Sequence, residues 1–172
     1  MDEIAKLAIS DAKDRLKAQL DLVYALDRQA MTFFGYTATV TVAGTTAAAG
    51  LAAGWLMEGK TISTSGQIAI LGLGLVAAGF FFTAAMCLSV MKSWKVALPG
   101  REPEFWQWAM EEPVSSLPEI ASAYLSQMAV SVKLLKDGSE TMSTGLANAR
   151  GVALASGLIG ICMGALAALA RN

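Results

Sequence analysis

A single uncharged stretch most constrains how this chain can fold. Asp27 and Arg28 form a charged pair, and the next residue with a formal charge is Glu58. Residues 29–57 between them are rich in Ala, Gly and Thr. As a helix they are long enough to cross the hydrocarbon core of a bilayer, which is about 30 Å thick. The stretch therefore predicts a transmembrane helix.

Two further stretches meet the same test. Residues 66–91 and residues 151–170 contain no Asp, Glu, Lys or Arg. The whole chain is 55% hydrophobic and only 16% charged, whereas a soluble domain is about 25% charged. We therefore predict a single-domain, all-α integral membrane bundle with about three transmembrane helices, a cytoplasmic helical portion and no β-sheet. The alternative is a soluble all-α bundle, which would have to bury three uncharged helices within 172 residues.

The distribution of Lys and Arg predicts the orientation of these helices. Cytoplasmic segments next to transmembrane helices carry an excess of Lys and Arg. Residues 1–28 contain five such residues and residues 92–150 contain six, while the segment between the first two spans holds only Lys60 and the tail only Arg171. We expect residues 1–28 and 92–150 to be cytoplasmic and the C-terminus to lie outside.

Both segments expected in the cytoplasm carry an apolar residue every three or four positions, as one face of a helix requires. In the first segment these residues are Ile4, Ala8, Ala12, Leu16, Leu20 and Val23. In the second they are Ile120, Tyr124, Met128, Val132 and Leu135. Because an isolated helix is marginally stable, we expect the two stripes to pack together or to bind a protein partner.

The ends of these helices are predicted with different clarity. No Gly or Pro occurs before Gly35, so the first helix should continue directly into the span at residues 29–57. The second helix has two possible courses at residues 136–140. It either breaks and restarts at a capping box formed by Asp137 and Glu140, or it continues through Gly138 at a cost of about 1 kcal/mol.

Threonine recurs every four residues inside the first span, at Thr37, Thr41 and Thr45. One interpretation is that each hydroxyl donates to the carbonyl four residues earlier, which satisfies it within its own helix. The other is that the three hydroxyls form a polar stripe facing a partner helix or a water-filled pore. The spacing alone does not separate these interpretations.

Small residues also recur every four positions in two of the spans, at Gly50 and Gly54, and at Ser156, Gly160, Gly164 and Ala168. Small side chains let transmembrane helices approach closely. Packing within one chain or self-association would explain the pattern. Because three helices provide little interior of their own, we expect a homo-oligomer.

Charged and aromatic residues mark the predicted membrane boundary. Asp27, Arg28 and Arg150 flank the first and third spans, either as interfacial charges or with Asp27 paired to Arg150. Arg101 is followed by a cluster of aromatic residues, Phe105, Trp106 and Trp108. This second group is expected either to lie on the inner leaflet or to bind an anionic ligand or headgroup by stacking and cation–π contact.

The sequence offers little support for catalysis. The chain contains no His, which removes the commonest general base and metal ligand. Cys87 and Cys162 lie in apolar stretches and are expected to be buried thiols. The spans lack the buried carboxylates of ion-coupled transporters, and a net charge of −1 gives no basic surface for nucleic acid. We expect no enzymatic activity, no cofactor, no metal and no nucleic-acid partner.

The layout resembles the small membrane effectors of bacterial anti-phage nucleotide-signalling systems, the Pycsar-effector-like and SLATT-type proteins. The similar pieces are "LDRQAM", with Asp27 and Ala30 at the first membrane boundary, and "ANARGVALASGLIG", with Asn148 and Arg150 before the last span. The chain departs from that pattern because it has no recognisable appended nucleotide-sensor domain. The resemblance implies an oligomer in the bacterial inner membrane that perturbs or permeates this membrane as part of anti-phage defence. The alternative is a non-conducting structural or adaptor subunit.

Overall fold

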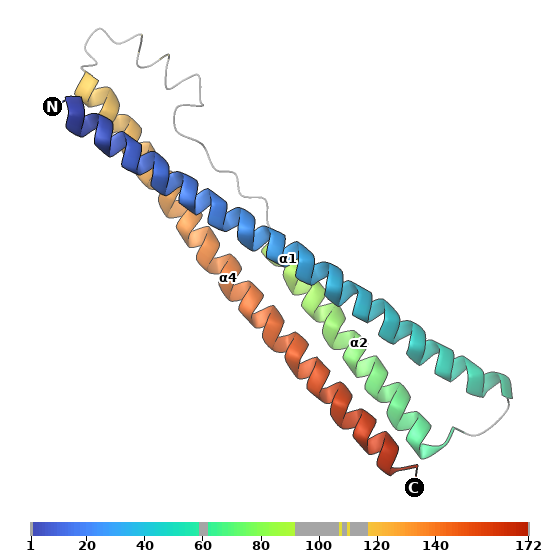
Figure 1. Ribbon diagram of the computed structural model, residues 1–172. Helices are drawn as coiled ribbons and strands as arrows, with labels where there is room; N and C mark the ends of the chain where they lie inside the picture. The colour runs from blue at the N-terminus through green and yellow to red at the C-terminus, as the bar shows by residue number, and fades with distance from the viewer. Residues whose placement is uncertain (1, 59–61, 92–106, 108–109, 111–116, 172) are drawn as a thin grey trace. The chain divides into compact units, whose positions relative to one another are not determined.

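Three long helices make up most of the part of the chain that the structure describes (Figure 1). The computed structural model describes residues 2–58, 62–91, 107, 110 and 117–171. Helix α1 comprises Asp2–Glu58, α2 comprises Thr64–Val90 and α4 comprises Leu117–Leu169, and no strand occurs among these described residues. The all-α prediction is therefore confirmed for this part of the chain. Each helix is long and apolar enough to cross a membrane, which indicates association with one.

The chain divides into two compact units, and two helices contribute to both. The first unit contains residues 1–27 and 93–143, and the second contains residues 28–92 and 144–172. Helix α1 is unbroken over 57 residues and α4 over 53 residues. The predicted continuation of the N-terminal helix into the first apolar stretch is thus confirmed. Continuity into this stretch is the expected result, because no Pro or Gly interrupts a good helix-forming sequence before Gly35.

The core of the first unit uses only part of the predicted apolar stripes. Leu16 of α1 is buried, as are Met128, Leu135 and Met142 of α4. On α4, Ser131 and Ser139 are also buried, and their hydroxyls donate to carbonyls of the same helix, those of Gln127 and Lys136. The buried face of α4 therefore advances by steps of three or four residues, and it includes serines that an apolar pattern overlooks.

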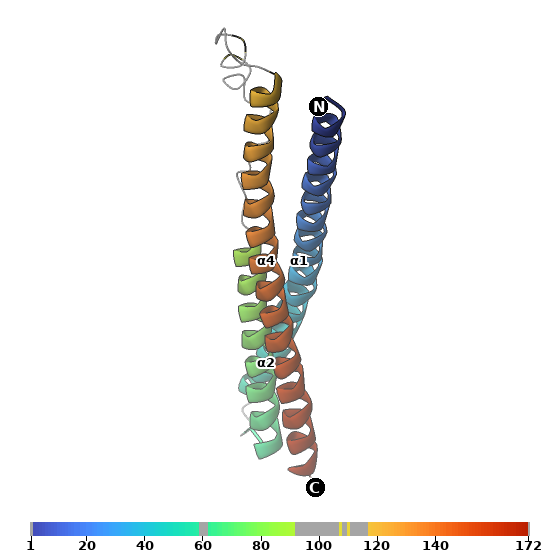
Figure 2. The same ribbon diagram turned by 90° about the vertical axis from the view of Figure 1, so that its left-hand side faces the viewer.

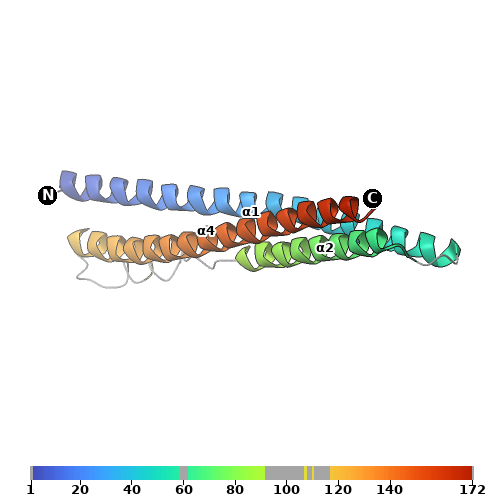
Figure 3. The ribbon, with the colours of Figure 1, turned by 90° about the horizontal axis from the view of Figure 1, so that it is seen from below.

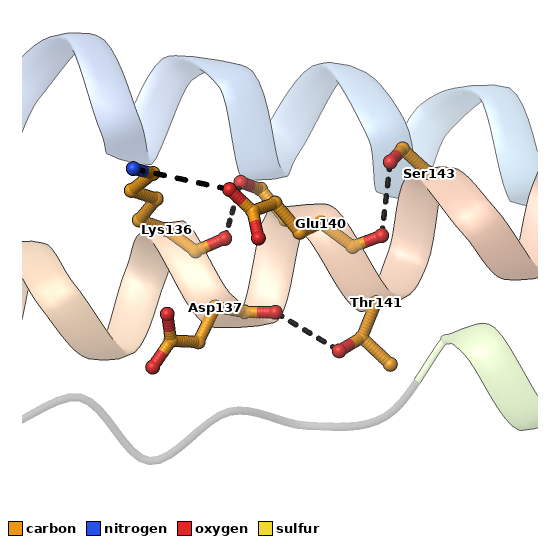
Figure 4. Close-up of polar contacts among 6 residues, drawn as sticks. Lys136, Asp137, Glu140, Thr141 and Ser143 are labelled. Atoms are coloured by element: carbon orange, nitrogen blue, oxygen red, sulfur yellow. Dashed lines mark hydrogen bonds and ion pairs between the residues drawn. The ribbon is translucent and has the colours of Figure 1, made fainter.

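Helix α4 continues through residues 136–140 and does not restart at a capping box (Figure 4). The side-chain oxygen of Thr141 donates to the Asp137 carbonyl at 2.9 Å, and that of Ser143 donates to the Glu140 carbonyl at 2.9 Å. Lys136 and Glu140 are one helical turn apart and form an ion pair, with 3.9 Å between Lys136 Nζ and Glu140 Oε1. Gly138 is buried. The second of the two courses left open by the sequence is the one that the chain adopts.

In the second unit, α1 and α2 pack closely through small residues. A β-carbon placed on Gly44 would lie 3.4 Å from Ala77 Cβ. The rings of Tyr36 and Phe80 meet edge to face, with 6.5 Å between their centroids.

Helix α2 begins after Ser63, whose hydroxyl accepts from the Gly66 amide at 3.3 Å. Such a cap satisfies an amide that has no partner inside the helix.

Helix α2 also runs antiparallel to the C-terminal half of α4 (Figure 2, Figure 3). A β-carbon placed on Gly72 would lie 2.7 Å from Met163 Cβ, and one on Gly79 would lie 2.8 Å from Ser156 Cβ. Because real side-chain contacts are longer than this, the backbones approach as closely as they do only because these positions lack a side chain. The glycines of α2 therefore determine how closely it packs against α4.

Candidate functional site

The threonine stripe of the first apolar stretch occupies several environments. Thr37 is fully buried and its hydroxyl lies 3.0 Å from the carbonyls of both Phe33 and Phe34. Thr41 is half-buried and donates to the Thr37 carbonyl at 2.8 Å, while Thr45 is exposed and donates to the Thr41 carbonyl. Each hydroxyl is thus satisfied within its own helix, as the first interpretation expected. Thr41 and Thr45 keep oxygen lone pairs on the outer part of the stripe.

The two predicted small-residue seams meet different surroundings. Ser156 is buried against Gly79, and a β-carbon on Gly160 would lie 2.8 Å from Val76 Cγ2. A β-carbon on Gly50, Gly54 or Gly164 would meet nothing within 4 Å, and Ala168 is exposed. Among the described residues, only the N-terminal half of the α4 seam therefore packs against another helix. The rest of the seams face outward.

The boundary charges border a groove of the second unit, which we call the boundary groove. Its volume is about 600 Å³ and it is open to the surroundings. Its lining residues come from one face of α1 and from α4, and they are Arg28, Gln29, Thr32, Phe33, Tyr36 and Arg150. The lining contains two guanidinium groups and no carboxylate. An arrangement of this kind attracts anions.

Hydrogen bonds fix part of the boundary groove. Arg150 donates from Nη2 to the Gln29 side-chain oxygen at 3.3 Å, which joins residues 121 positions apart. The partner of Arg150 is thus an uncharged side chain. The ion pair between Asp27 and Arg150 stays a prediction, because Asp27 belongs to the first unit and Arg150 to the second. The Thr32 hydroxyl donates to the Arg28 carbonyl at 2.9 Å, so it has no proton left for a ligand.

Sequence reasoning singled out Arg28 and Arg150 but missed the rest of the boundary groove. Positions 28, 32 and 36 are four residues apart, and positions 29 and 33 flank them on the same helical face. The signal was therefore present in the spacing. It was hidden because Gln, Thr, Phe and Tyr inside an apolar stretch look like ordinary helix-packing residues.

Other predicted sites are either untested or changed. Arg101, Phe105, Trp106 and Trp108 lie outside the described residues. Cys87 is buried as expected, but the expectation was wrong for Cys162, which is exposed. Within the described part of the chain, no group of three or more His, Cys, Asp or Glu residues is placed to hold a metal ion.

Comparison with known proteins adds no relative. No protein-family model, no curated protein and no solved structure matches this chain.

Proposed function

We propose that the chain is an integral membrane protein whose three apolar stretches, residues 29–57, 66–91 and 151–170, cross a bilayer. The observation that carries this proposal is the exposure of large apolar side chains around the second unit. Phe81 is 66% exposed, Ile161 71% and Val42 66%. Apolar surface of this extent is unfavourable in water and is covered at no cost by lipid. Flotation with vesicles after alkaline carbonate extraction tests it, and recovery in the soluble fraction would refute it.

The Lys and Arg distribution supports one orientation in the bacterial inner membrane. Residues 1–28 and 92–150 would be cytoplasmic, and the segment before α2 and the C-terminus would be outside. Cysteines introduced at Ser10 and at Ser65 test this orientation, since Ser10 would lie on the cytoplasmic side of the membrane and Ser65 on the outer side. In a background with Cys87 and Cys162 replaced, an impermeant maleimide added to intact spheroplasts should label position 65 and spare position 10. The reverse pattern would refute the orientation.

We further propose that the protein works as a homo-oligomer that perturbs or permeates the membrane. Gly50, Gly54 and Gly164 offer outward faces on which a second copy can pack closely. The Thr41 and Thr45 hydroxyls, whose protons are already donated, present acceptor lone pairs that suit a wet, cation-conducting lumen. Helices α1 and α4 each connect the two units without a break. A rearrangement of the first unit would therefore be transmitted directly to the membrane helices.

Dye release from liposomes tests the permeation proposal. Replacing Thr41 by Val and Thr45 by Leu removes the outer hydroxyls, and release should fall at least tenfold. The matched control is Thr39→Leu, because Thr39 is also exposed and also donates to its own helix, but lies on another face of α1. Equal release from both variants would exclude a lumen lined by the threonine stripe.

A specific observation favours the alternative, a non-conducting adaptor. The first unit leaves large apolar side chains uncovered, among them Leu7 at 73% and Tyr24 at 69% exposure. A protein partner docked on this unit would cover them. Overexpression separates the two functions: a pore former should depolarise cells, whereas an adaptor should leave the membrane potential intact and co-purify with a defined partner in stoichiometric amounts.

A further inference from the structure

The boundary groove has a composition suited to a ligand that is anionic at one end and apolar at the other. Its cationic residues, Arg28 and Arg150, lie at the start of two uncharged stretches. Its apolar residues, Phe33 and Tyr36, lie further along α1, inside the first uncharged stretch. At about 1.5 Å per residue, Phe33 is roughly 8 Å and Tyr36 roughly 12 Å beyond Arg28 along the helix axis.

The guanidinium groups have donors to spare. Arg28 makes no side-chain hydrogen bond or ion pair within the described part of the chain, although it is exposed next to a second arginine. Arg150 uses one of its five N–H groups for Gln29. The Gln29 amide nitrogen is a further donor, because that contact occupies only its oxygen. Like charges of this kind in one groove repel each other unless an anion lies between them.

We propose that the boundary groove binds an anionic phospholipid, with the phosphate between Arg28 and Arg150 and an acyl chain along Phe33 and Tyr36. The inference rests on the proposed insertion of the helices in a bilayer. In that setting both arginines lie at the cytoplasmic headgroup level, and the aromatic wall lies at the depth of the first acyl carbons. A small soluble anion would make no apolar contact with Phe33 and Tyr36. Bidentate guanidinium contacts suit the oxygens of a phosphodiester.

The primary test compares two lipids that differ only in headgroup. The full-length protein in neutral detergent is titrated with phosphatidylglycerol and with phosphatidylcholine of identical chains, and lipid-bound species are counted by native mass spectrometry. A basic residue near an anionic headgroup contributes about fivefold in affinity, so two should give about 25-fold tighter binding of phosphatidylglycerol. Equal binding of the two lipids would overturn the proposal without any variant being needed.

Matched variants locate the site. Arg28→Gln with Arg150→Gln should bring phosphatidylglycerol down to the phosphatidylcholine level, whereas Arg28→Lys with Arg150→Lys should retain most of the preference. The control is Arg15→Gln with Arg171→Gln, which removes the same charge outside the boundary groove and should retain the full preference. A preference lost equally in the control would reflect net charge alone and would overturn the proposal.

A competition experiment separates lipid from soluble phosphate. Glycerophosphoglycerol, the deacylated form of phosphatidylglycerol, carries the same phosphodiester without acyl chains, so at equal concentration it should displace less than a tenth of bound phosphatidylglycerol. Displacement at equal concentration would mean a site for a soluble anion and would overturn the assignment to lipid. Flotation with pure phosphatidylcholine vesicles is run in parallel. If the protein inserts into the vesicles but shows no preference for phosphatidylglycerol, only the lipid site in the boundary groove is refuted. If the protein fails to insert, the proposed function is refuted.

Discussion

The close approach of α2 and α4 predicts that two similar Gly→Ala substitutions have opposite effects. A β-carbon on Gly79 would lie 2.8 Å from Ser156 Cβ, whereas one on Gly74 of the same helix would meet nothing within 4 Å. Ordinary contacts begin near 3.4 Å, and the added β-carbon would lie closer still to Ser156 Oγ. Gly79→Ala therefore displaces the Ser156 side chain or forces the helices apart locally by at least about 0.6 Å, the difference between 3.4 Å and 2.8 Å. A gap of that size forfeits about a quarter of the dispersion attraction of the atoms that line it.

The expected magnitudes follow from this geometry. Overpacking of a tight contact costs about 1–3 kcal/mol. Replacing a helical Gly by Ala gains about 1 kcal/mol by itself. Gly74→Ala should therefore raise the free energy of unfolding slightly. The free energy of unfolding of Gly79→Ala should be about 1–3 kcal/mol lower than that of Gly74→Ala. The measurement is an SDS titration of the detergent-solubilised protein, followed by circular dichroism.

A double-mutant cycle identifies the cause. Ser156→Gly removes the side chain that Gly79→Ala would strike, so the double variant should regain most of the lost stability, with a coupling free energy of about 0.5–3 kcal/mol. The control pairs Gly74→Ala with Ser156→Gly and should show additive effects. Equal stability of the Gly74 and Gly79 variants, or a coupling free energy near zero, would refute the proposed packing of α2 on α4.

Three further predictions concern polar groups. The Gln19 side-chain oxygen is buried and has no hydrogen-bond partner among the residues that the structure describes. Gln19→Leu should therefore raise the free energy of unfolding by about 1–3 kcal/mol, and a loss of stability would show that the amide is satisfied. Ser63→Ala removes the acceptor for the Gly66 amide and should cost about 0.5–2 kcal/mol in thermal unfolding, while Ser63→Asp should not. Thr37→Val should cost less than about 1 kcal/mol, because its hydroxyl bonds only its own helix, whereas Thr37→Leu should cost about 1–3 kcal/mol by overpacking; equal costs would contradict this reading.

Local rules account for the parts of the fold that were predicted correctly. The three helices follow from uncharged stretches and from helix-forming sequence, both of which act over neighbouring residues. The unbroken course of α1 follows in the same way from the absence of Gly and Pro before Gly35. The course of α4 through Gly138 was undecided, because a cost of about 1 kcal/mol for Gly is too small to settle a helix boundary without its packing partners.

The sequence by itself determined that the described stretches are helical and which of them suit lipid, since hydrophobicity and helix propensity are properties of the chain in any surroundings. Only the tertiary structure decided which small residues pack, because a four-residue spacing defines a face of a helix but not what that face meets. Thus Ser156 and Gly160 lie against α2, while Gly50, Gly54 and Gly164 face outward. Likewise, Gln29 and Arg150 meet across 121 positions only because α1 and α4 lie side by side there.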